Sequence, residues 1–226
     1  MSVSPDPVVH VLDDPQRTCA EILAEQASRG GSIVLTGGSA VGPAYTTAAR
    51  LEPNWRKVTL WWGDERCVRP GDPRSNYLLA RETLLDRLLH LPGKVNRIRG
   101  EADPAEAAAE YDALLRDATL DLLFLGLGPD GHCASLFPGS PQLEVDDRLA
   151  TSGPPGLAPL VERVTLTLPA LRSARRIVFI ALGEAKADAV AAAFGGPVSP
   201  DVPASLVRLA ETPVEVLVDP AAAAKL

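Results

Sequence analysis

Short apolar runs alternate with amphipathic stretches along most of this chain. The clearest runs cover residues 32–36 (SIVLT), 58–62 (VTLWW), 121–125 (DLLFL), 177–182 (IVFIAL) and 214–218 (VEVLV). Continuous apolar runs of this length are typical of strands that are buried on both faces of a sheet. Because stretches of helical periodicity separate them, the pattern predicts βαβ units and a mostly parallel sheet.

The stretches between these runs carry helix signals. Asp14 and Pro15 are typical of a helix N-cap and first position, and this helix is expected to end near Gly30. Alanine loses no side-chain entropy in a helix, so the alanine-rich stretch 104–118 predicts another. The leucine spacing predicts one long helix over about 75–90. Further expected elements are helices at 43–51, 183–194 and 204–209, a frayed terminal helix at 221–224, a strand at 164–168 and an edge strand at 94–99.

Glycine and proline gather in the remaining segments, which predict loops at 126–141, 148–159 and 195–203. The chain shows no internal repeat and no linker-like segment. We therefore expect a single catalytic domain over residues 1–226, of α/β class, with a mostly parallel Rossmann-like sheet flanked by helices.

Composition and charge narrow the function classes. Hydrophobic residues make up 46% and charged residues 23% of the chain, which indicates a globular protein. No apolar run approaches the ~18 residues of a membrane span, and no secretory signal is visible, so the expected location is cytoplasmic. The net charge of −7 disfavours nucleic acid and anionic membranes as partners. A monomer is the default expectation because no heptad seam appears.

Two motifs that could suggest a cofactor or a metal are unconvincing. The three cysteines are an odd number without CxxC spacing, which argues against disulfides and a structural zinc site. We expect them to be small buried residues, although Cys133 lies in the most suggestive motif. Residues 126–131 match the GxGxxG dinucleotide pattern, but the prolines and glycine at 138–141 leave room for little more than one helical turn after it. That pattern needs a following helix to receive the pyrophosphate, so we expect no nicotinamide or flavin site here.

Four polar turns follow predicted strands and are the candidates for chemistry. They are TGGS (36–39), GDER (63–66), GLGPDGHCASLFP (126–138) and GEAK (183–186). Ligands of open parallel sheets bind outside the carboxyl ends of the strands. All four turns are therefore expected to meet in one crevice.

The glycine turn and Lys186 are candidates for anion binding. Gly37, Gly38 and Ser39 lead into a helix, where free N–H groups and the helix dipole favour an anion. The alternative is a plain tight turn between strand and helix. Lys186 lies in the first turn of the helix expected after Gly183 and opposes its dipole, which makes sense if an anion also binds there. An ordinary exposed lysine is the alternative.

Two other turns offer proton transfer and charge stabilisation. His132 lies in a glycine-rich loop two residues after Asp130. An ordinary imidazole titrates near pH 6.5 and can take and return a proton at neutral pH, while a carboxylate orients it. The alternative is a surface histidine beside a turn-forming aspartate. Arg66, in the run with Asp64 and Glu65, could hold a phosphate or a developing oxyanion, or belong to a solvated salt-bridge cluster.

Taken together, these segments resemble the 6-phosphogluconolactonase family. The matching segments are LTGGS (35–39), WWGDER (61–66), DPRSNY (72–77), DLLFLGLGPDGHCASLFPG (121–139), RVTLTLPAL (163–171) and GEAKADAV (183–190), which span nearly the whole chain. The wider superfamily includes glucosamine-6-phosphate deaminases, so the fold is expected to resemble the glucosamine-6-phosphate deaminase/ribose-5-phosphate isomerase-like fold.

The resemblance implies hydrolysis of a phosphorylated sugar lactone, 6-phospho-D-glucono-1,5-lactone, to 6-phospho-D-gluconate without metal or organic cofactor. It implies that His132 is the general base on water, that Asp130 supports it and that Arg66 stabilises the developing charge. It also implies a phosphate side and a set of matched residues with less definite roles. The phosphate side is Gly37, Gly38, Ser39 and Lys186, with Arg163 as an addition; the less definite residues are Asp64, Glu65 and Asn76.

Two alternatives remain at this point. A glucosamine-6-phosphate deaminase/isomerase needs a base that moves a proton between C1 and C2. A sugar-phosphate-sensing domain keeps the phosphate-binding turns but has no need of Asp130 and His132. An α/β-hydrolase is disfavoured because no G-x-S-x-G motif is present. The sequence leaves open which of Arg66 and Arg163 contacts the phosphate.

Overall fold

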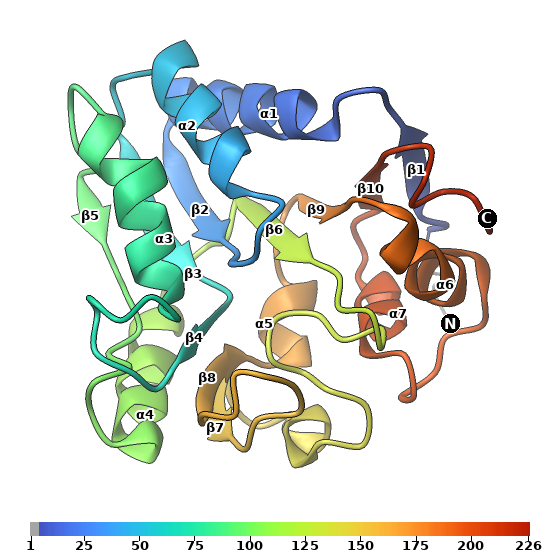
Figure 1. The fold of residues 1–226 in the computed structure, drawn as a ribbon. Helices are drawn as coiled ribbons and strands as arrows, with labels where there is room; N and C mark the ends of the chain where they lie inside the picture. The colour runs from blue at the N-terminus through green and yellow to red at the C-terminus, as the bar shows by residue number, and fades with distance from the viewer. Residues whose placement is uncertain (1–4) are drawn as a thin grey trace.

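The computed structural model describes residues 5–226, in which a seven-stranded sheet forms the centre of the molecule (Figure 1). The strand order is β1-β10-β9-β6-β2-β3-β5, and all neighbouring strands are parallel. The strands are β1 (Val8–Val11), β2 (Gly31–Leu35), β3 (Val58–Trp62), β5 (Lys94–Val95), β6 (Leu122–Gly126), β9 (Ile177–Ala181) and β10 (Val214–Val218). The expected α/β class with a mostly parallel sheet is confirmed.

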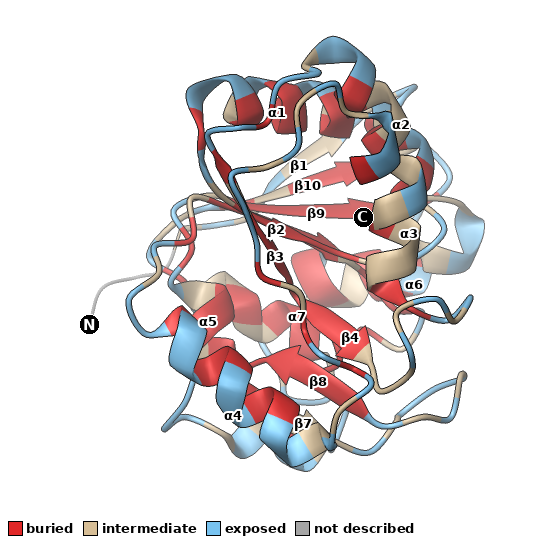
Figure 2. Ribbon diagram, turned by 90° about the vertical axis from the view of Figure 1, so that its left-hand side faces the viewer, coloured by how far each residue is buried: buried red, intermediate tan, exposed pale blue. Residues whose placement is uncertain are grey.

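Helices cover both faces of this sheet, as Figure 2 shows. The pair α1 (Pro15–Arg29) and α2 (Gly42–Leu51) packs on one face, and α3 (Asn76–Thr83) lies beside α2. The opposite face carries α5 (Leu168–Arg172) and α7 (Pro203–Leu206). Asp14 caps α1 as expected, because its side chain accepts the Arg17 N–H at 2.9 Å.

A second sheet of three antiparallel strands lies below the main sheet (Figure 2). Its order is β4-β8-β7, with β4 (Asp64–Arg66), β8 (Arg163–Leu166) and β7 (Ala150–Gly153), and α4 (Pro104–Leu115) packs on it. Since β4 begins two residues after β3 ends, Gly63 is the point where the chain leaves one sheet and enters the other. The segment GDER is therefore a short strand and not only a turn.

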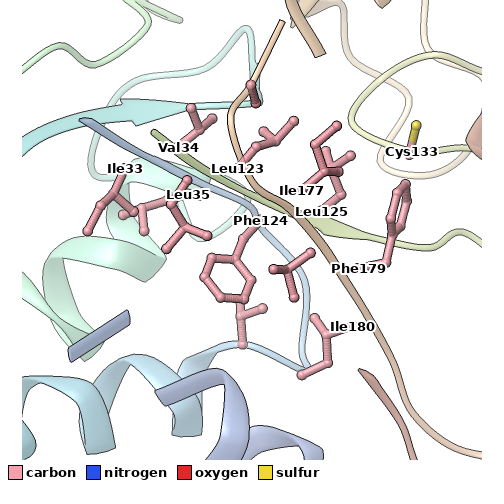
Figure 3. Close-up of a cluster of buried hydrophobic side chains, with 14 of the residues drawn as sticks. Ile33, Val34, Leu35, Leu123, Phe124, Leu125, Cys133, Ile177, Phe179 and Ile180 are labelled. Atoms are coloured by element: carbon pink, nitrogen blue, oxygen red, sulfur yellow. The ribbon is translucent and has the colours of Figure 1, made fainter. Parts of the chain in front are cut away.

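The core lies between the central strands and the layers that cover them (Figure 3). Ile33, Phe124, Ile177 and Phe179 are each fully buried, and Cys133 from the loop after β6 belongs to the same cluster. Burial of such side chains contributes roughly 1.5–3 kcal/mol each relative to exposure. The carboxyl ends of β2, β3, β6 and β9 are thus held at one edge of a rigid scaffold.

Several expected elements differ in the structure. The helix expected over about 75–90 ends at Thr83, where the Thr46 hydroxyl of α2 donates to the Thr83 carbonyl at 3.1 Å, and a 3₁₀ turn (Leu85–Arg87) follows. The loop expected at 148–159 contains β7, because pairing with β8 supplies a partner that no local pattern indicates. Residues 221–224 form hydrogen-bonded turns in which Ala222 is fully buried, so they are not a frayed helix.

The helix expected at 183–194 is broken into shorter pieces. A 3₁₀ turn (Glu184–Lys186) precedes α6 (Ala187–Val190), which continues as a π-helical turn (Ala191–Gly195). A further 3₁₀ turn (Val207–Leu209) extends α7, and another (Pro141–Glu144) lies in the long loop after β6. Across the described part of the chain, no helix is long and apolar enough to cross a membrane.

Candidate active site

The four polar turns meet in one cleft at the carboxyl ends of the parallel strands. Its volume is about 490 Å³, and its lining includes Gly37 and Gly38 after β2, Asp64 and Arg66 of β4, the loop after β6, and Lys186 after β9. The convergence predicted from the strand-end positions is therefore confirmed. Its cause is the topology, since parallel strands present all their carboxyl ends at the same edge.

His132 and Asp130 form a hydrogen-bonded pair at this cleft. The His132 Nδ1 lies 2.5 Å from Asp130 Oδ1, and the Asp130 carboxylate also accepts the backbone N–H of His132 at 3.2 Å. The imidazole retains 20% of its side-chain exposure and lines the cleft. With Nδ1–H donated to the carboxylate, Nε2 keeps its lone pair and can accept a proton.

The loop after β6 holds the imidazole by close packing as well. The Phe137 ring lies 4.5 Å from the His132 ring, centroid to centroid, and is itself almost fully buried. The imidazole also lies so close to Gly128 that a Cβ at residue 128 would overlap Nδ1. A carboxylate, a phenyl ring and a glycine therefore constrain the orientation of His132.

Lys186 and the glycine turn form the wall beside this pair. The Lys186 ammonium donates to the Leu127 carbonyl at 2.6 Å and is partly buried. Burial lowers the pKa of Lys186, and the nearby charge of Asp130 opposes that effect. Gly37 and Gly38 line the cleft, whereas Ser39 lines an adjoining pocket of about 270 Å³ that shares Lys186 and both glycines with it.

Two arginines face each other across the antiparallel pair of β4 and β8. Arg66 and Arg163 are direct partners in the register, and both line the cleft. Arg163 is 3% exposed, and burial lowers the pKa of its guanidinium, an effect that the charge of Arg66 reinforces and that of Asp64 opposes. Adjacent like charges repel each other, and a bound anion relieves that repulsion.

The remaining hydrogen bonds of these arginines organise nearby loops. Arg163 donates to the carbonyls of Leu157, Pro159 and Val161 at 2.9–3.3 Å, and thereby shapes the loop whose residues Leu157 and Ala158 line the cleft. Arg66 Nη1 donates to the Arg74 carbonyl at 2.6 Å. Each guanidinium is thus held in place while it faces the cleft.

Asp64 and Asn76 are buried at the floor of the cleft. The Asp64 carboxylate accepts hydrogen bonds from Ser135 Oγ at 2.7 Å and from Asn76 Nδ2 at 3.1 Å. Both residues line the cleft. This network connects β4 to α3 and to the loop that carries His132.

Glu65 points away from the cleft and binds the start of α3. Its carboxylate accepts the N–H groups of Arg66, Asn76 and Tyr77 and the Ser75 hydroxyl, at 2.7–2.9 Å. Burial raises the pKa of Glu65, because desolvation outweighs these four hydrogen bonds, which favour the charged form. Of the candidates named from sequence, Glu65 and Asp130 are the two that do not line the cleft or its adjoining pocket; Asp130 reaches the cleft only through its hydrogen bond to His132.

We expect Glu65→Ala to destabilise the fold. Four donors, in two buried and two partly buried hydrogen bonds, would lose their acceptor, and each unsatisfied buried group costs roughly 1–3 kcal/mol, partly offset by water or rearrangement. The expected loss of unfolding free energy is therefore about 3 kcal/mol or more, measured by urea denaturation. The matched control is Glu82→Ala at an exposed position of α3, with an expected change within about 0.5 kcal/mol. Equal midpoints for the two variants would contradict this role for Glu65.

Some lining residues escaped the sequence analysis. Phe137, Leu157 and Ala158 form an apolar part of the wall, and Thr36 and Gly128, which belong to turns named from sequence but were not singled out, also line the cleft. Phe137 and Gly128 belong to the motif that contains His132, but nothing local indicates that they contact its ring. Leu157 and Ala158 lie in a loop that hydrogen bonds from Arg163 hold, and no local pattern in that loop indicates that it reaches the cleft.

The loop after β6 does not have the geometry of a dinucleotide site. Gly126–Gly131 continues into turns and an isolated bridge between Cys133 and Leu136, and no helix begins there. The expectation that the GxGxxG match lacks the following helix is therefore confirmed. Cys133 is fully buried, and burial raises the pKa of its thiol, so it is not an exposed nucleophile. Within residues 5–226, no three His, Cys, Asp or Glu side chains are grouped in a way that could hold a metal ion.

The arrangement brings a group that can transfer a proton and groups that can bind an anion to one cleft. An oriented imidazole lies beside a partly buried ammonium and a glycine turn, and two guanidiniums lie on the small sheet. Such a site can bind an anionic ligand and activate water against an electrophilic carbon. The chain's net charge of −7 makes this local collection of cations more informative, because the overall field opposes anion binding.

Comparison with known proteins gives consistent matches. Residues 8–216 match the family model described as glucosamine-6-phosphate isomerases/6-phosphogluconolactonase. The 6-phosphogluconolactonase of Streptomyces coelicolor is 36% identical, over 92% of this chain and 90% of its own length. That of Mycobacterium leprae is 38% identical, over 86% and 84%.

Solved structures show the same fold. The 6-phosphogluconolactonase of Trypanosoma brucei has a TM-score of 0.83 and 28% identity, and the alignment covers 98% of this chain and 99% of that one. A monomeric glucosamine-6-phosphate deaminase has a TM-score of 0.86 over 98% of this chain and 100% of its own, at 21% identity. The expected likeness to the deaminase fold is thus confirmed at the level of architecture.

Proposed function

This chain belongs to the glucosamine-6-phosphate isomerase/6-phosphogluconolactonase family, and within it we propose that the protein is a lactone hydrolase. It converts 6-phospho-D-glucono-1,5-lactone and water into 6-phospho-D-gluconate, a step of the oxidative pentose phosphate pathway. The observation that carries the proposal is the imidazole of His132, which is hydrogen-bonded to Asp130 and lines the same cleft as the cations that suit a phosphorylated substrate. The relatives from Streptomyces coelicolor and Mycobacterium leprae, at 36% and 38% identity, are named 6-phosphogluconolactonase.

His132 acts as the general base. Nε2 takes a proton from a water molecule while the water oxygen forms a bond to C1 of the lactone, and the carbonyl electrons move to the exocyclic oxygen. Asp130 accepts Nδ1–H and stabilises the imidazolium that results. The positive charge of Arg66, whose guanidinium donates a hydrogen bond to the Arg74 carbonyl, stabilises the oxyanion.

Collapse of the tetrahedral intermediate opens the ring. The bond between C1 and the ring oxygen breaks, and the imidazolium returns its proton to that oxygen, which becomes the C5 hydroxyl. The new carboxylic acid then ionises in water. A lactone is an activated ester with an alkoxide leaving group, so one general base and water suffice, and no nucleophilic side chain is needed.

The phosphate is bound by the glycine turn and Lys186, with Arg163 as a further cation. Gly37 and Gly38 allow close approach of backbone N–H groups, and Gly38 has a φ of 101° that favours glycine. Lys186 touches the main cleft and the adjoining pocket that Ser39 lines. Every residue in this account comes from a single chain, so we propose that the monomer is active.

We also propose that the protein works in the cytoplasm. Its substrate and product are phosphorylated and anionic, and such molecules stay in the compartment where they are made because a charged group crosses hydrocarbon at high cost.

The decisive experiment is a direct assay of the wild-type protein. Freshly prepared lactone is mixed with the protein, and acid release is followed in a weakly buffered indicator solution. Release well above the spontaneous rate, and saturable in the lactone, supports the proposal. Ammonia release from glucosamine 6-phosphate without lactone hydrolysis would overturn it in favour of a deaminase. Saturable binding of the lactone without turnover would favour a sensor.

Lys186→Met is expected to raise KM about tenfold or more and to leave kcat within about threefold. Loss of uniform binding to the phosphate acts on substrate affinity, and a charge-assisted hydrogen bond contributes roughly 1.5–3 kcal/mol. Steady-state kinetics with the phosphorylated lactone check this. The unphosphorylated glucono-1,5-lactone is the control substrate, whose kcat/KM should change little. An equal loss for both substrates would show that Lys186 does not bind the phosphate.

A further inference from the structure

Tyr45, on α2, binds the last residue before the glycine turn. Its hydroxyl accepts the Thr36 N–H at 3.0 Å and donates to the Thr36 carbonyl at 2.7 Å. The side chain is fully buried. Thr36 directly precedes Gly37, and its own hydroxyl accepts the Gly126 N–H at 3.2 Å, so Tyr45 holds the point where two cleft-lining segments meet.

Tyr111, on α4, makes the same pair of hydrogen bonds one strand away. Its hydroxyl accepts the Trp62 N–H at 2.8 Å and donates to the Trp62 carbonyl at 2.9 Å. This side chain is also buried, at 1% exposure. Trp62 ends β3, and after Gly63 the chain enters β4 with Asp64 and Arg66.

The two hydroxyls supply hydrogen-bond partners to the backbone at the ends of neighbouring strands. β2 and β3 are paired up to Leu35 and Trp62, and beyond that point the residues at the sheet edge need partners for their backbone groups. β5 pairs only with Thr59 and Leu60, so it ends before Trp62. A tyrosine hydroxyl both donates and accepts, and can therefore bind the N–H and the C=O of one residue at once.

We propose that Tyr45 and Tyr111 are positioning residues of the active site, each for a different half of the reaction. Neither ring lines the cleft. Tyr45 acts through Thr36 on the glycine turn that binds the phosphate, and Tyr111 acts through Trp62 on the strand that carries Arg66. This assignment rests on the proposed function for the roles of the two halves.

The proposal predicts opposite kinetic effects for two chemically identical changes. Tyr45→Phe is expected to raise KM about tenfold with kcat within about twofold, because the glycine turn that binds the phosphate shifts. Tyr111→Phe is expected to lower kcat about tenfold with KM within about twofold, because Arg66 shifts against the developing charge. A loss of folded protein alone would lower the apparent kcat of both variants and leave both KM values unchanged.

The third tyrosine of the chain offers a matched control. The Tyr77 hydroxyl makes no hydrogen bond to any residue of the described range 5–226, and its side chain is partly exposed. Tyr77→Phe deletes the same atom and is expected to leave kcat and KM within about twofold of the wild type. The Tyr77 ring packs against Trp62, but its hydroxyl binds no strand end in the described part of the chain, so this variant shows the effect of losing a hydroxyl that holds no backbone group.

Calorimetric titration tests the positioning roles by ligand binding alone, so its result does not depend on whether the protein hydrolyses the lactone. The probes are glucitol 6-phosphate, which has an alcohol at C1, and 6-phospho-D-gluconate, which has a carboxylate there. Tyr45→Phe should weaken both about tenfold. Tyr111→Phe should bind glucitol 6-phosphate as the wild type does, at full stoichiometry, and lose only the additional affinity for the carboxylate.

These binding patterns support the positioning roles even if the wild type hydrolyses no lactone, in which case the proposed function alone fails. The positioning proposal is overturned if both variants match Tyr77→Phe in affinity. It is also overturned if both variants bind with wild-type affinity but at fewer sites per protein molecule, because partial unfolding has that effect.

Discussion

His132→Ala is expected to lower kcat by about 10²–10⁴-fold with the fold intact. This is the range over which a positioned general base contributes, and nothing else in the cleft replaces an imidazole whose second nitrogen is held by a carboxylate. The fold should survive because the His132 side chain lies at the cleft wall. Once it is removed, water can hydrate the partly exposed Asp130 carboxylate. Acid release from the lactone gives kcat, and far-ultraviolet circular dichroism verifies the fold.

His90→Ala is the matched control for this variant. His90 lies outside the cleft, and the hydrogen bonds that it makes to Pro53 and Trp55 use its backbone groups. Its kcat should stay within about twofold of the wild type. An unchanged kcat in His132→Ala would falsify the assignment of His132 as the base.

Gly128→Ala is expected to reduce kcat about 10²-fold or more, although it removes no functional group. A Cβ at residue 128 would overlap His132 Nδ1 and lie 2.7 Å from Asp130 Oδ1. The loop cannot easily yield, since the Gly128 N–H donates to the His132 carbonyl at 2.8 Å and its carbonyl accepts the Gly131 N–H at 3.1 Å. The imidazole must therefore turn away from Asp130, and misplacement by about 1 Å can cost 10²-fold.

The control for this substitution is Gly71→Ala. Gly71 has open space where the methyl group would lie and no positive φ, so the added carbon meets nothing. We expect kinetics like those of the wild type. If Gly128→Ala retained wild-type kcat and KM, the imidazole would not need the orientation that the structure shows. Histidine NMR signals of His132 provide a direct check, since they should shift in Gly128→Ala and not in Gly71→Ala.

The site places its cations against the overall charge of the protein. The chain has 29 acidic and 22 basic residues, yet Lys186, Arg66 and Arg163 all face one cleft. Many of the other arginines are neutralised by partners at the surface, as Arg97 is by Glu101 and Arg176 by Glu215. The cations left to face the cleft can therefore act on a ligand.

Much of the site could be predicted because its parts are encoded locally. The turns TGGS, GDER, GPDGH and GEAK each follow an apolar run, and the rule that ligands bind at the carboxyl ends of parallel strands joins them. The hydrogen bond between Asp130 and His132 spans only two residues, so it too follows from local spacing. Glu65 shows the limit of this reasoning, since its neighbours face the cleft while its own carboxylate binds the start of α3.

The sequence by itself determined the positions of the central strands, the cap of α1 and the chemistry available at each strand end. These depend on side chains within a few residues of one another, whose periodicity and hydrogen bonding act locally. Only the tertiary structure decided that β4 and β8 form a separate antiparallel sheet, that α3 ends at Thr83, and that Tyr45 and Tyr111 hold the strand ends. Contacts such as that between Trp62 and Tyr111 join residues far apart in the chain, and their formation depends on the packing of the whole core, which no local pattern encodes.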